Sequence, residues 1–405
     1  MSDLRSRLTA LRGQAGASEL ESLRHRIERV GAGRRRRAPR RMRPSDATLA
    51  SRLGGVVVRE GVVLVRERLP VDSAHGAFAL SEEGFAEALS YCDAAAGRDA
   101  RACVFMDTET TGLAGGSGTL VFLLGMARFS AEGLELSQLF LTGFQGEEAM
   151  LEEARAILGG AETLVTFNGR SFDAPLLAAR YRLSGFEDPF APLRHVDLLH
   201  VTRRIFRSRW PDCRLQTAEQ RLLGHARIGD LPGSEAPRAW FEWVRHGRDD
   251  ELAAVCAHNR QDLLSLAVLP AALHRSHNDP ASAGADVLAC ARHQRQALKG
   301  EAGDRSAFEY LARHRPLLET QGLLELARLA RRRRRWDLAV ELWEQLAAAG
   351  VSVAIEHLAK YYEHEERDLE RALEATARLL AGAPCDRDHR RRAARLRARL
   401  ARPRR

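Results

Sequence analysis

The sequence predicts an α/β domain followed by an all-helical domain. From about residue 100, short apolar runs alternate with amphipathic segments, a pattern typical of a mixed sheet flanked by helices. After Ala271 the strand-like runs stop and the apolar spacing becomes helical. The chain has 405 residues, which is long enough for two or three domains with a substantial core.

Two β-branched runs in LGGVVVREGVVLVRERLP (53–70) meet at Arg59–Gly61 and predict a β-hairpin. Further strands are expected at VFMDTE (104–109), TLVFLLGMARFS (119–130), LELSQLFLTGF (134–144) and TLVTFNG (163–169). Helices are expected at 81–96, 146–160, 175–183, 197–206 and 252–270. Three strands followed by helix–strand–helix predict antiparallel hairpins that feed a mixed sheet.

Two segments of the helical region match each other, LLELARLARRRRRWDLAVELWEQLAAAG (323–350) and AIEHLAKYYEHEERDLERALEATARLLAG (354–382). Ala339 corresponds to Ala372, and Leu326 to Leu358. Small residues at recurring positions let paired helices approach closely, so the segments resemble tetratricopeptide repeats. An ordinary helical bundle with a chance similarity is the alternative.

These patterns give a domain organisation. We expect a basic helical or disordered arm at 1–45, a β-hairpin and helix at 46–99, and a mixed-sheet domain at 100–275. A tetratricopeptide-like helical domain is expected at 283–390 and a basic tail at 391–405.

The formal net charge is +9, and almost every cation is arginine, because the only lysines are Lys299 and Lys360. Arginines gather in GRRRRAPRRMR (33–43), in RRRRR (331–335) and in the last sixteen residues, RRRAARLRARLARPRR. Such runs form solvated faces or disordered tails, and the excess of arginine over lysine can reflect codon usage. Because guanidinium groups fork onto phosphates, the runs are equally typical of nucleic-acid binding.

Composition also bears on the compartment. The hydrophobic fraction of 45% fits a folded soluble protein, and no uninterrupted apolar run approaches the length of a membrane span. The first residues, MSDLRSRLTALRGQ, lack the apolar core of a signal peptide, so we expect a cytoplasmic protein. The six cysteines are scattered without a CxxC pair, which favours reduced and mostly buried thiols.

Asp107 and Glu109 lie at the end of a buried strand in VFMDTETTGL (104–113). Side chains at i and i+2 of a strand point to the same face, so the two carboxylates stand side by side. Two buried like charges need a compensating cation, either an arginine or a metal ion. An exposed strand end with two solvated acids is the alternative.

Two further segments offer carboxylates. In LVTFNGRSFDAPLL (164–177), Asp173 precedes a helix that has Pro175 in its first turn, and a plain N-cap explains it locally. In LAAVCAHNRQDLLSLAVLP (252–270), His258 and Asp262 are four residues apart on one helix face. A lone helical histidine is more often structural, but a histidine–aspartate pair that joins other acids is typical of a site.

Together these segments resemble the DEDD superfamily of 3′–5′ exonucleases, which has an RNase H-like fold, and more narrowly the YprB-type RNase H-like nuclease family. The resemblance spans about residues 75–270 and includes six segments in order. They are FMDTETTGLAGGSGTLVFLLG (105–125), VTFNGRSFDAPLL (165–177), HVDLLHVTRRIF (195–206), CRLQTAEQRLLG (213–224), GDLPGSEAP (229–237) and HNRQDLLSLAVL (258–269).

The resemblance implies a site of four metal-binding carboxylates: Asp107, Glu109, Asp173 and Asp262. Two Mg²⁺ or Mn²⁺ ions about 4 Å apart would clamp the attacking and leaving oxygens of a phosphodiester. Asp107 would bridge the two ions, Glu109 and Asp262 would complete the shell of one, and Asp173 would hold the other through water.

His258 is the candidate general base, or else it orients the attacking water. DEDD enzymes with a catalytic histidine usually place it five residues before the last aspartate, whereas His258 stands four before Asp262. Residues after the acidic pair hold the terminal base in related enzymes. Substrate contacts are therefore expected at Thr110, Gly112, Leu113 and Asn168, with strand-ending turns as the alternative. Arg203 and Arg204 can meet phosphates or form a solvated face, and Asp197 is expected to cap its helix.

The sequence thus predicts a metal-dependent hydrolase that cleaves phosphodiester bonds of single-stranded DNA or RNA, from a 3′ end. The helical repeats are expected to recruit substrate or a protein partner, and no membrane is expected. A nucleic-acid-binding scaffold with a weakly active or inactive nuclease-like domain is the alternative. The polymer, exo- or endonuclease action, the partner of the repeats and the oligomeric state stay open.

Overall fold

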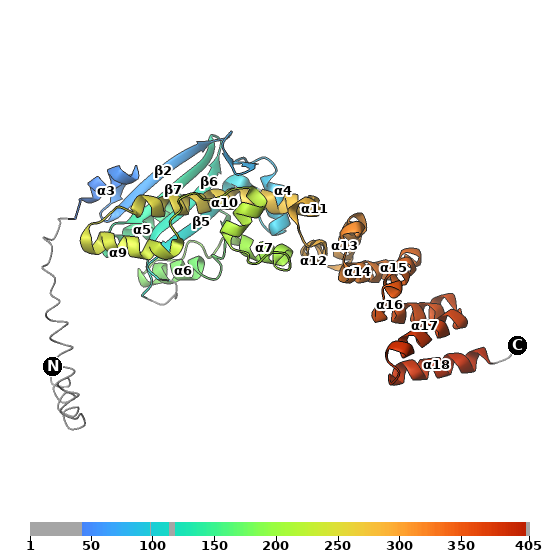
Figure 1. Cartoon of the computed structure of the whole chain (residues 1–405). Helices are drawn as coiled ribbons and strands as arrows, with labels where there is room; N and C mark the ends of the chain where they lie inside the picture. Colours follow the sequence, from blue (N-terminus) through green and yellow to red (C-terminus); the bar gives the residue numbers. More distant parts are fainter. Residues whose placement is uncertain (1–42, 98, 113–117, 402–405) are drawn as a thin grey trace, which may run out of the picture.

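The computed structural model describes residues 43–97, 99–112 and 118–401. Within them the chain forms a seven-stranded sheet flanked by helices, and then a succession of helices that extends away from the sheet (Figure 1). The predicted fold class, a mixed α/β sheet flanked by helices and followed by an all-helical C-terminal region, is confirmed.

The order of strands in the main sheet is β1-β2-β7-β6-β5-β8-β9. Its strands are β1 (Val56–Arg59), β2 (Val62–Pro70), β5 (Cys103–Thr110), β6 (Val121–Ser130), β7 (Gly133–Leu141), β8 (Thr163–Thr166) and β9 (Arg194–Asp197). Neighbours from β1 to β5 pair antiparallel, whereas β5, β8 and β9 pair parallel. The carboxyl ends of β5, β8 and β9 therefore meet at one edge of the sheet.

The predicted hairpin at 53–70 is present as β1 and β2. β2 pairs with β7 along its whole length, so the hairpin belongs to the main sheet rather than leading into it. Before it lies α3 (Asp46–Leu53), which begins at the N-cap Ser45. After it come a small second sheet of β3 (Ala74–His75) and β4 (Phe78–Ala79), and then the expected helix as α4 (Phe85–Cys92).

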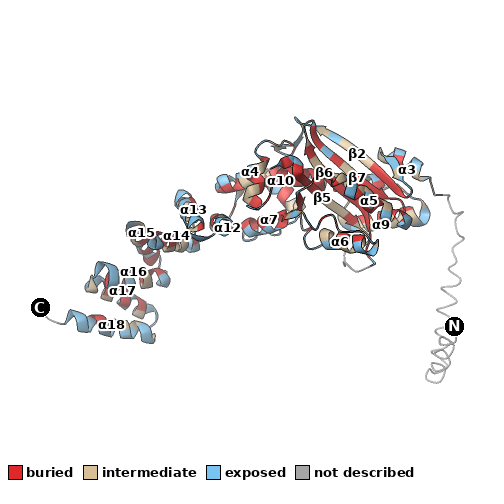
Figure 2. Cartoon of the chain, turned by 180° about the vertical axis from the view of Figure 1, so that it is seen from behind, coloured by how far each residue is buried: buried red, intermediate tan, exposed pale blue. Residues whose placement is uncertain are grey.

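Alternate residues of β5 enter two different cores. Val104 and Met106 pack with residues of α5 (Glu147–Ile157), α6 (Asp173–Leu183) and α9 (Ala236–His246). Cys103 and Phe105 pack with residues of α4, α7 (Leu198–Phe206) and α10 (Leu252–Asn278). Buried residues accordingly run along the central strands (Figure 2). By the same alternation, Asp107 and Glu109 face α10.

The elements that were not predicted from sequence include β9, α9 and α3. β9 has four residues and only one strongly apolar side chain, Val196, so its pairing with β8 defines it rather than its own pattern. α9 follows a Pro- and Gly-rich stretch, and its Trp240 and Trp243 donate indole N–H groups to the carbonyls of Leu141 and Thr142. α3 lies at the border of the expected arm.

The C-terminal region contains only helices among its described residues. They are α11 (Pro280–Ala283), α12 (Val287–Leu298), α13 (Gly300–Arg313), the 3-10 helix η5 (Arg315–Leu317), α14 (Thr320–Arg332), α15 (Trp336–Ala348), α16 (Ser352–Tyr361), the π-helix η6 (Tyr362–Glu366), α17 (Leu369–Gly382) and α18 (Arg387–Leu400). The matching segments form two helical hairpins, α14–α15 and α16–α17, with Ala339 and Ala372 both fully buried. The assignment to tetratricopeptide repeats stays a prediction.

The expected basic tail is mostly helix, because α18 runs to Leu400 and buries Ala393 and Leu396. Its apolar residues are spaced for helical packing, a pattern that the many arginines obscure. Most of the expected N-terminal arm lies outside the described residues. All six cysteines are free, and four of them are buried, as expected. In the described parts of the chain, no helix combines the length and apolarity needed to cross a membrane.

Candidate metal centre

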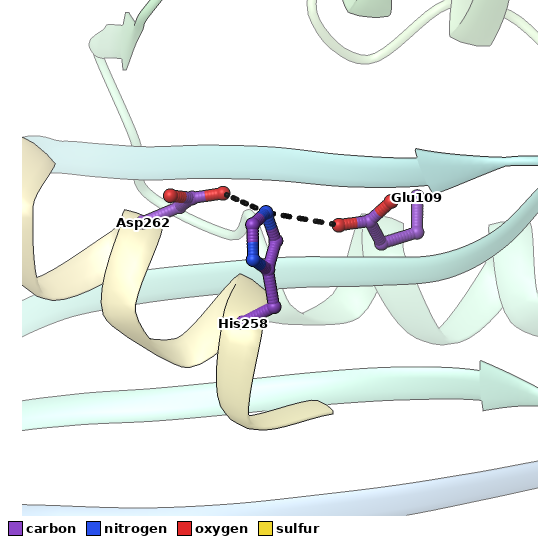
Figure 3. Close-up of side chains that lie close together, drawn as sticks. All are labelled: Glu109, His258 and Asp262. Atoms are coloured by element: carbon purple, nitrogen blue, oxygen red, sulfur yellow. Dashed lines mark ion pairs between the residues drawn. The ribbon is translucent and has the colours of Figure 1, made fainter. Parts of the chain in front are cut away.

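Four of the predicted site residues converge where the end of β5 meets α10. Asp107 and Glu109 come from β5, and His258 and Asp262 lie one turn apart on α10. His258 Nε2 is 3.5 Å from Asp262 Oδ2 and 3.9 Å from Glu109 Oε1 (Figure 3). Glu109, His258 and Asp262 each offer a ligand atom within 4.8 Å of the others, close enough to hold one metal ion.

Asp107 is fixed by an amide relay from α10 and β7. Asn259 Nδ2 donates to Asp107 Oδ2 at 2.8 Å, and Gln138 Nε2 donates to Asn259 Oδ1 at 2.8 Å. Gly125 lies directly opposite Asp107 on β6, and a Cβ there would stand 2.2 Å from Asn259 Oδ1. The glycine therefore leaves the space through which Asn259 reaches the carboxylate.

Asp173 is the first residue of α6, not the residue that caps it, because Phe172 occupies the N-cap position without a side-chain bond. The Asp173 carboxylate accepts a hydrogen bond from the Thr108 hydroxyl. Thr108 lies between Asp107 and Glu109 and points to the opposite face of β5. The strand end thus presents two acids towards α10 and holds a third, on α6, through the residue between them.

The four carboxylic acids share an electrostatic cost. Burial raises the pKa of Asp107 well above its usual range, and the charges of Asp262, Asp173 and Glu109 raise it further. Burial and repulsion from Asp262 and Asp173 raise the pKa of Glu109 to about 8. Burial raises the pKa of Asp173 to about 6 although the bond from Thr108 opposes it. Burial also raises the pKa of Asp262, against the attraction of Arg227.

A buried arginine from the loop after η3 (the π-helix Glu219–Leu223) enters this cluster. Arg227 forks onto the buried Glu219, with Nη2 to Oε1 at 2.6 Å and Nε to Oε2 at 2.7 Å. It also pairs with Asp230 at 3.1 Å and with Asp262 Oδ1. This pairing uses one oxygen of Asp262 and leaves Oδ2 on the side of His258. Burial lowers the pKa of Arg227, but its acidic partners outweigh this and raise it.

A second loop acid fixes the orientation of His258. The ring Nδ1 lies 2.8 Å from Asp230 Oδ1 and 2.9 Å from Oδ2. Donation of Nδ1–H to this carboxylate leaves the lone pair on Nε2, the nitrogen that faces Glu109 and Asp262. Asp230 therefore determines which ring nitrogen can accept a proton at the carboxylate cluster.

Thr110, Gly112 and Asn168, the expected substrate contacts that the structure describes, lie around the same strand ends, and no hydrogen bond joins these three to the acidic cluster. The Thr110 hydroxyl donates to the carbonyl of Gly112 at 3.0 Å, which closes the turn after β5. Asn168 follows β8 with a left-handed φ of 70°, and its N–H donates to Asp197 at 2.8 Å. Leu113 lies outside the described residues. Asp197 caps α7 as expected, accepting from the N–H of Leu199.

Sequence reasoning missed Asn259, Arg227, Asp230 and Glu219. A signal existed for Asn259, because it falls between Val255, Cys256 and Leu263 on the apolar face of α10, where an amide needs a partner. Glu219, Arg227 and Asp230 lie in or beside segments that carried the family resemblance. Their surroundings have no strand or helix period, so nothing local indicates that they are buried together.

The charges in this centre do not balance. It holds six carboxylates, those of Asp107, Glu109, Asp173, Glu219, Asp230 and Asp262. Among the described residues, Arg227 is the one arginine paired with them. The donors are chiefly carboxylate oxygens, the ligands that Mg²⁺ and Mn²⁺ prefer. The residues present therefore fit a divalent cation. Such a cation would offset the repulsion among the acids that the guanidinium of Arg227 does not neutralise.

The comparisons with known proteins place the chain in a family. Residues 104–274 match the family described as RNase_H superfamily, and this range contains every residue of the centre. The chain is also 32% identical over 343 residues to the uncharacterized protein YprB of Bacillus subtilis (strain 168), covering 80% of this chain and 81% of that protein. The chain belongs to the YprB-related family of RNase H-like proteins. Membership of this family supports the general assignment of the protein as a nuclease, and hence as a hydrolase.

Proposed function

We propose that this protein is a metal-dependent nuclease that hydrolyses phosphodiester bonds of single-stranded RNA or DNA, acting from the 3′ end. The observation that carries the proposal is the gathering of six acidic side chains at the end of β5, where Arg227 pairs with only three of them. Keeping so many acids together costs folding free energy, and bound cations would offset that cost. The 3′–5′ direction rests on the resemblance to DEDD exonucleases.

The metal ligands in this proposal are Asp107, Glu109, Asp173 and Asp262. Bound Mg²⁺ or Mn²⁺ ions, two in the proposed mechanism, would neutralise charge on the phosphodiester and lower the pKa of a water molecule. The chain itself keeps these ligands oriented. Asn259 fixes Asp107, the Thr108 hydroxyl fixes Asp173, and Arg227 holds one oxygen of Asp262.

His258 acts in this proposal on the attacking water. With Nδ1–H donated to Asp230, Nε2 can accept a proton from a water molecule beside Glu109 and Asp262. The same arrangement would let His258 orient the water while another base takes the proton. A neutral polar side chain separates the two roles, because His258→Gln can hold a water molecule by a hydrogen bond but cannot become a cation.

A scaffold function is the second candidate, and one observation favours it. Arg227 already neutralises part of the charge on Asp262, which reduces the gain from binding a cation there. In that case the domain would bind nucleic acid and turn it over poorly.

The test is hydrolysis of end-labelled single-stranded RNA and DNA by the full-length protein with Mg²⁺, Mn²⁺ or EDTA. Asp107→Ala is compared with Glu152→Gln, a control on the exposed face of α5. The proposal expects metal-dependent shortening from the 3′ end, lost by at least about 1000-fold in Asp107→Ala and unchanged in the control. Binding without cleavage under every metal would instead support the scaffold.

A further inference from the structure

Two hollows lie along α12, between the sheet edge that carries the metal centre and the C-terminal helices. The first, here called the α7–α12 hollow, has a volume of about 490 Å³. It is lined by all four residues of β9, by residues 92–95 at the end of α4, by Arg170, by α7 and by α12 with the adjoining Lys299. The second, the α12–α14 hollow, has a volume of about 780 Å³ and is lined by α12, α13 and α14. Gln296 on α12 lines both, so the two hollows adjoin.

Both hollows carry an excess of positive charge. In the α7–α12 hollow, Arg194 is paired with Asp93 at 2.7 Å, and Asp197 already accepts three backbone N–H groups. Three other cations there have no carboxylate partner among the residues that the structure describes. They are Arg170, Arg204 and Lys299.

The α12–α14 hollow contains four arginines against two acids. Asp304 pairs with both Arg295 and Arg332, and the guanidinium of Arg333 stands over the Phe308 ring. Arg292 is exposed, and within the described chain no carboxylate pairs with it. A positive field therefore continues along α12 from one hollow into the next.

The α7–α12 hollow also lies next to the metal centre. β5, β8 and β9 are parallel, so their carboxyl ends share one edge, and two strand spacings separate β5 from β9 by about 10 Å. Arg170 lines the hollow and stands in the turn that leads to Asp173. The N–H of Arg170 donates to Asp197 at 3.0 Å, which joins that turn to β9 and α7.

The helices that form this surface are firmly attached to the α/β domain. Arg204 Nη1 donates to His293 Nδ1 at 2.5 Å, and His293 Nε2 donates to the carbonyl of Tyr91 at 2.7 Å. Ser208 donates to Asp286, the N-cap of α12, at 2.8 Å. One apolar core also continues from α7 and α10 into α12–α17. The two hollows therefore keep a fixed position relative to the carboxylates.

We infer that the two hollows form one track for the sugar–phosphate backbone of a single-stranded nucleic acid, running from the carboxylates across α12 to the C-terminal helices. This inference rests on the proposed nuclease function and extends it, because it assigns the helical region a part in holding substrate. Guanidinium and ammonium groups recognise phosphates without reading bases. The track therefore binds RNA and DNA strands with little sequence preference and with strong salt dependence.

The test neutralises three exposed cations of the track in the full-length protein, Arg204→Gln, Arg292→Gln and Lys299→Gln. The matched control, Arg66→Gln, Arg155→Gln and Arg182→Gln, makes the same change of charge on β2, α5 and α6, at exposed residues. Affinity for a long labelled single strand is measured by fluorescence anisotropy in EDTA between about 50 and 200 mM salt. Hydrolysis of the long strand and of a trinucleotide is measured with Mn²⁺.

The track variant is expected to lose at least about tenfold in affinity, and the slope of log K against log salt is expected to fall by about 2, near 0.7 for each phosphate contact. Its hydrolysis of the long strand should fall much more than that of the trinucleotide, which is too short to cross α12. Equal affinities of the track and control variants for the long strand would overturn the inference. Binding of polyglutamate but not of nucleic acid would also overturn it.

A failure of the proposed nuclease function can be distinguished from a failure of the track. A wild-type protein that binds the long strand through the track cations, but hydrolyses neither substrate with any metal, would contradict the nuclease proposal. That result would leave the track established, because its anisotropy measurement needs no cleavage.

Discussion

Two buried ionic clusters in this chain have opposite compositions. At the end of β5, six acidic side chains gather, and the guanidinium of Arg227 pairs with three of them, Glu219, Asp230 and Asp262. In the C-terminal helices, the buried Glu363 of η6 faces three arginines of α18, with Arg395 at 2.8 Å, Arg399 at 3.4 Å and Arg392 at 3.8 Å.

The difference lies in how each excess charge meets solvent. Arg395 and Arg399 keep about half of their side chains exposed, so water screens the surplus positive charge around Glu363. At β5 the acids outnumber the guanidinium and are shielded from water, and burial is the largest cause of the raised pKa values of Asp107, Glu109 and Asp262. The cluster around Glu363 exposes its excess charged groups to water. The β5 cluster instead buries its excess acidic groups, where a bound cation can pair with them.

The largest effect on stability is expected from Arg227→Met. The change leaves Glu219, which is fully buried, and Asp262 without their cation, so unfolding in EDTA should cost about 3–5 kcal/mol less. Chemical denaturation of the full chain measures this, with Arg155→Met on α5 as the exposed control. Recovery of part of the lost stability with Mn²⁺ would sharpen the contrast between the two clusters. A decrease of less than about 1 kcal/mol in the free energy of unfolding would contradict the prediction.

A smaller effect, on rate, is expected from Asp230→Asn. The amide can no longer require Nδ1 of His258 to carry the proton, so Nε2 is no longer kept free to accept one. On the proposed mechanism, kcat for single-strand hydrolysis should fall by about 10–100-fold with little change in KM. The control is Asp250→Asn, an exposed acid before α10. An unchanged kcat would remove Asp230 from the positioning of His258.

The smallest effect is expected from Glu363→Gln. The substitution removes the carboxylate that three arginines share, but two of them, Arg395 and Arg399, are about half exposed and can turn to solvent. The free energy of unfolding should fall by about 1–2 kcal/mol, with no recovery on adding Mn²⁺ and no change in trinucleotide hydrolysis. Glu365→Gln, an exposed neighbour, is the control. Recovery with Mn²⁺ here would break the contrast between the two clusters.

Local periodicity explains what the sequence could predict at the metal centre. Asp107 and Glu109 share a face because strand side chains alternate, and His258 and Asp262 share one because helix residues four apart lie together. The hairpin β1–β2 and the strands β5 to β8 have the same origin in period-two patterns and turn residues.

The partners of these residues depend on contacts between distant parts of the chain. Arg227 meets Asp262 across 35 residues, and Gln138 meets Asn259 across 121. Neither pairing leaves a periodic signal, because the packing of loops and helices decides it. β9 was not predicted for the same reason, because its four residues form a strand only by pairing with β8.

The central claim is that the uncompensated carboxylates at β5 form a cation site, and thermal unfolding with and without Mn²⁺ or Mg²⁺ tests it most directly. The account predicts that the ion raises the melting temperature of the full-length protein. At an ion concentration a hundredfold above Kd, each occupied site should add about 2.7 kcal/mol to the free energy of unfolding. Asp107→Asn should lose most of this rise, and Glu152→Gln should keep it. A wild-type melting temperature that neither ion shifts would contradict the account.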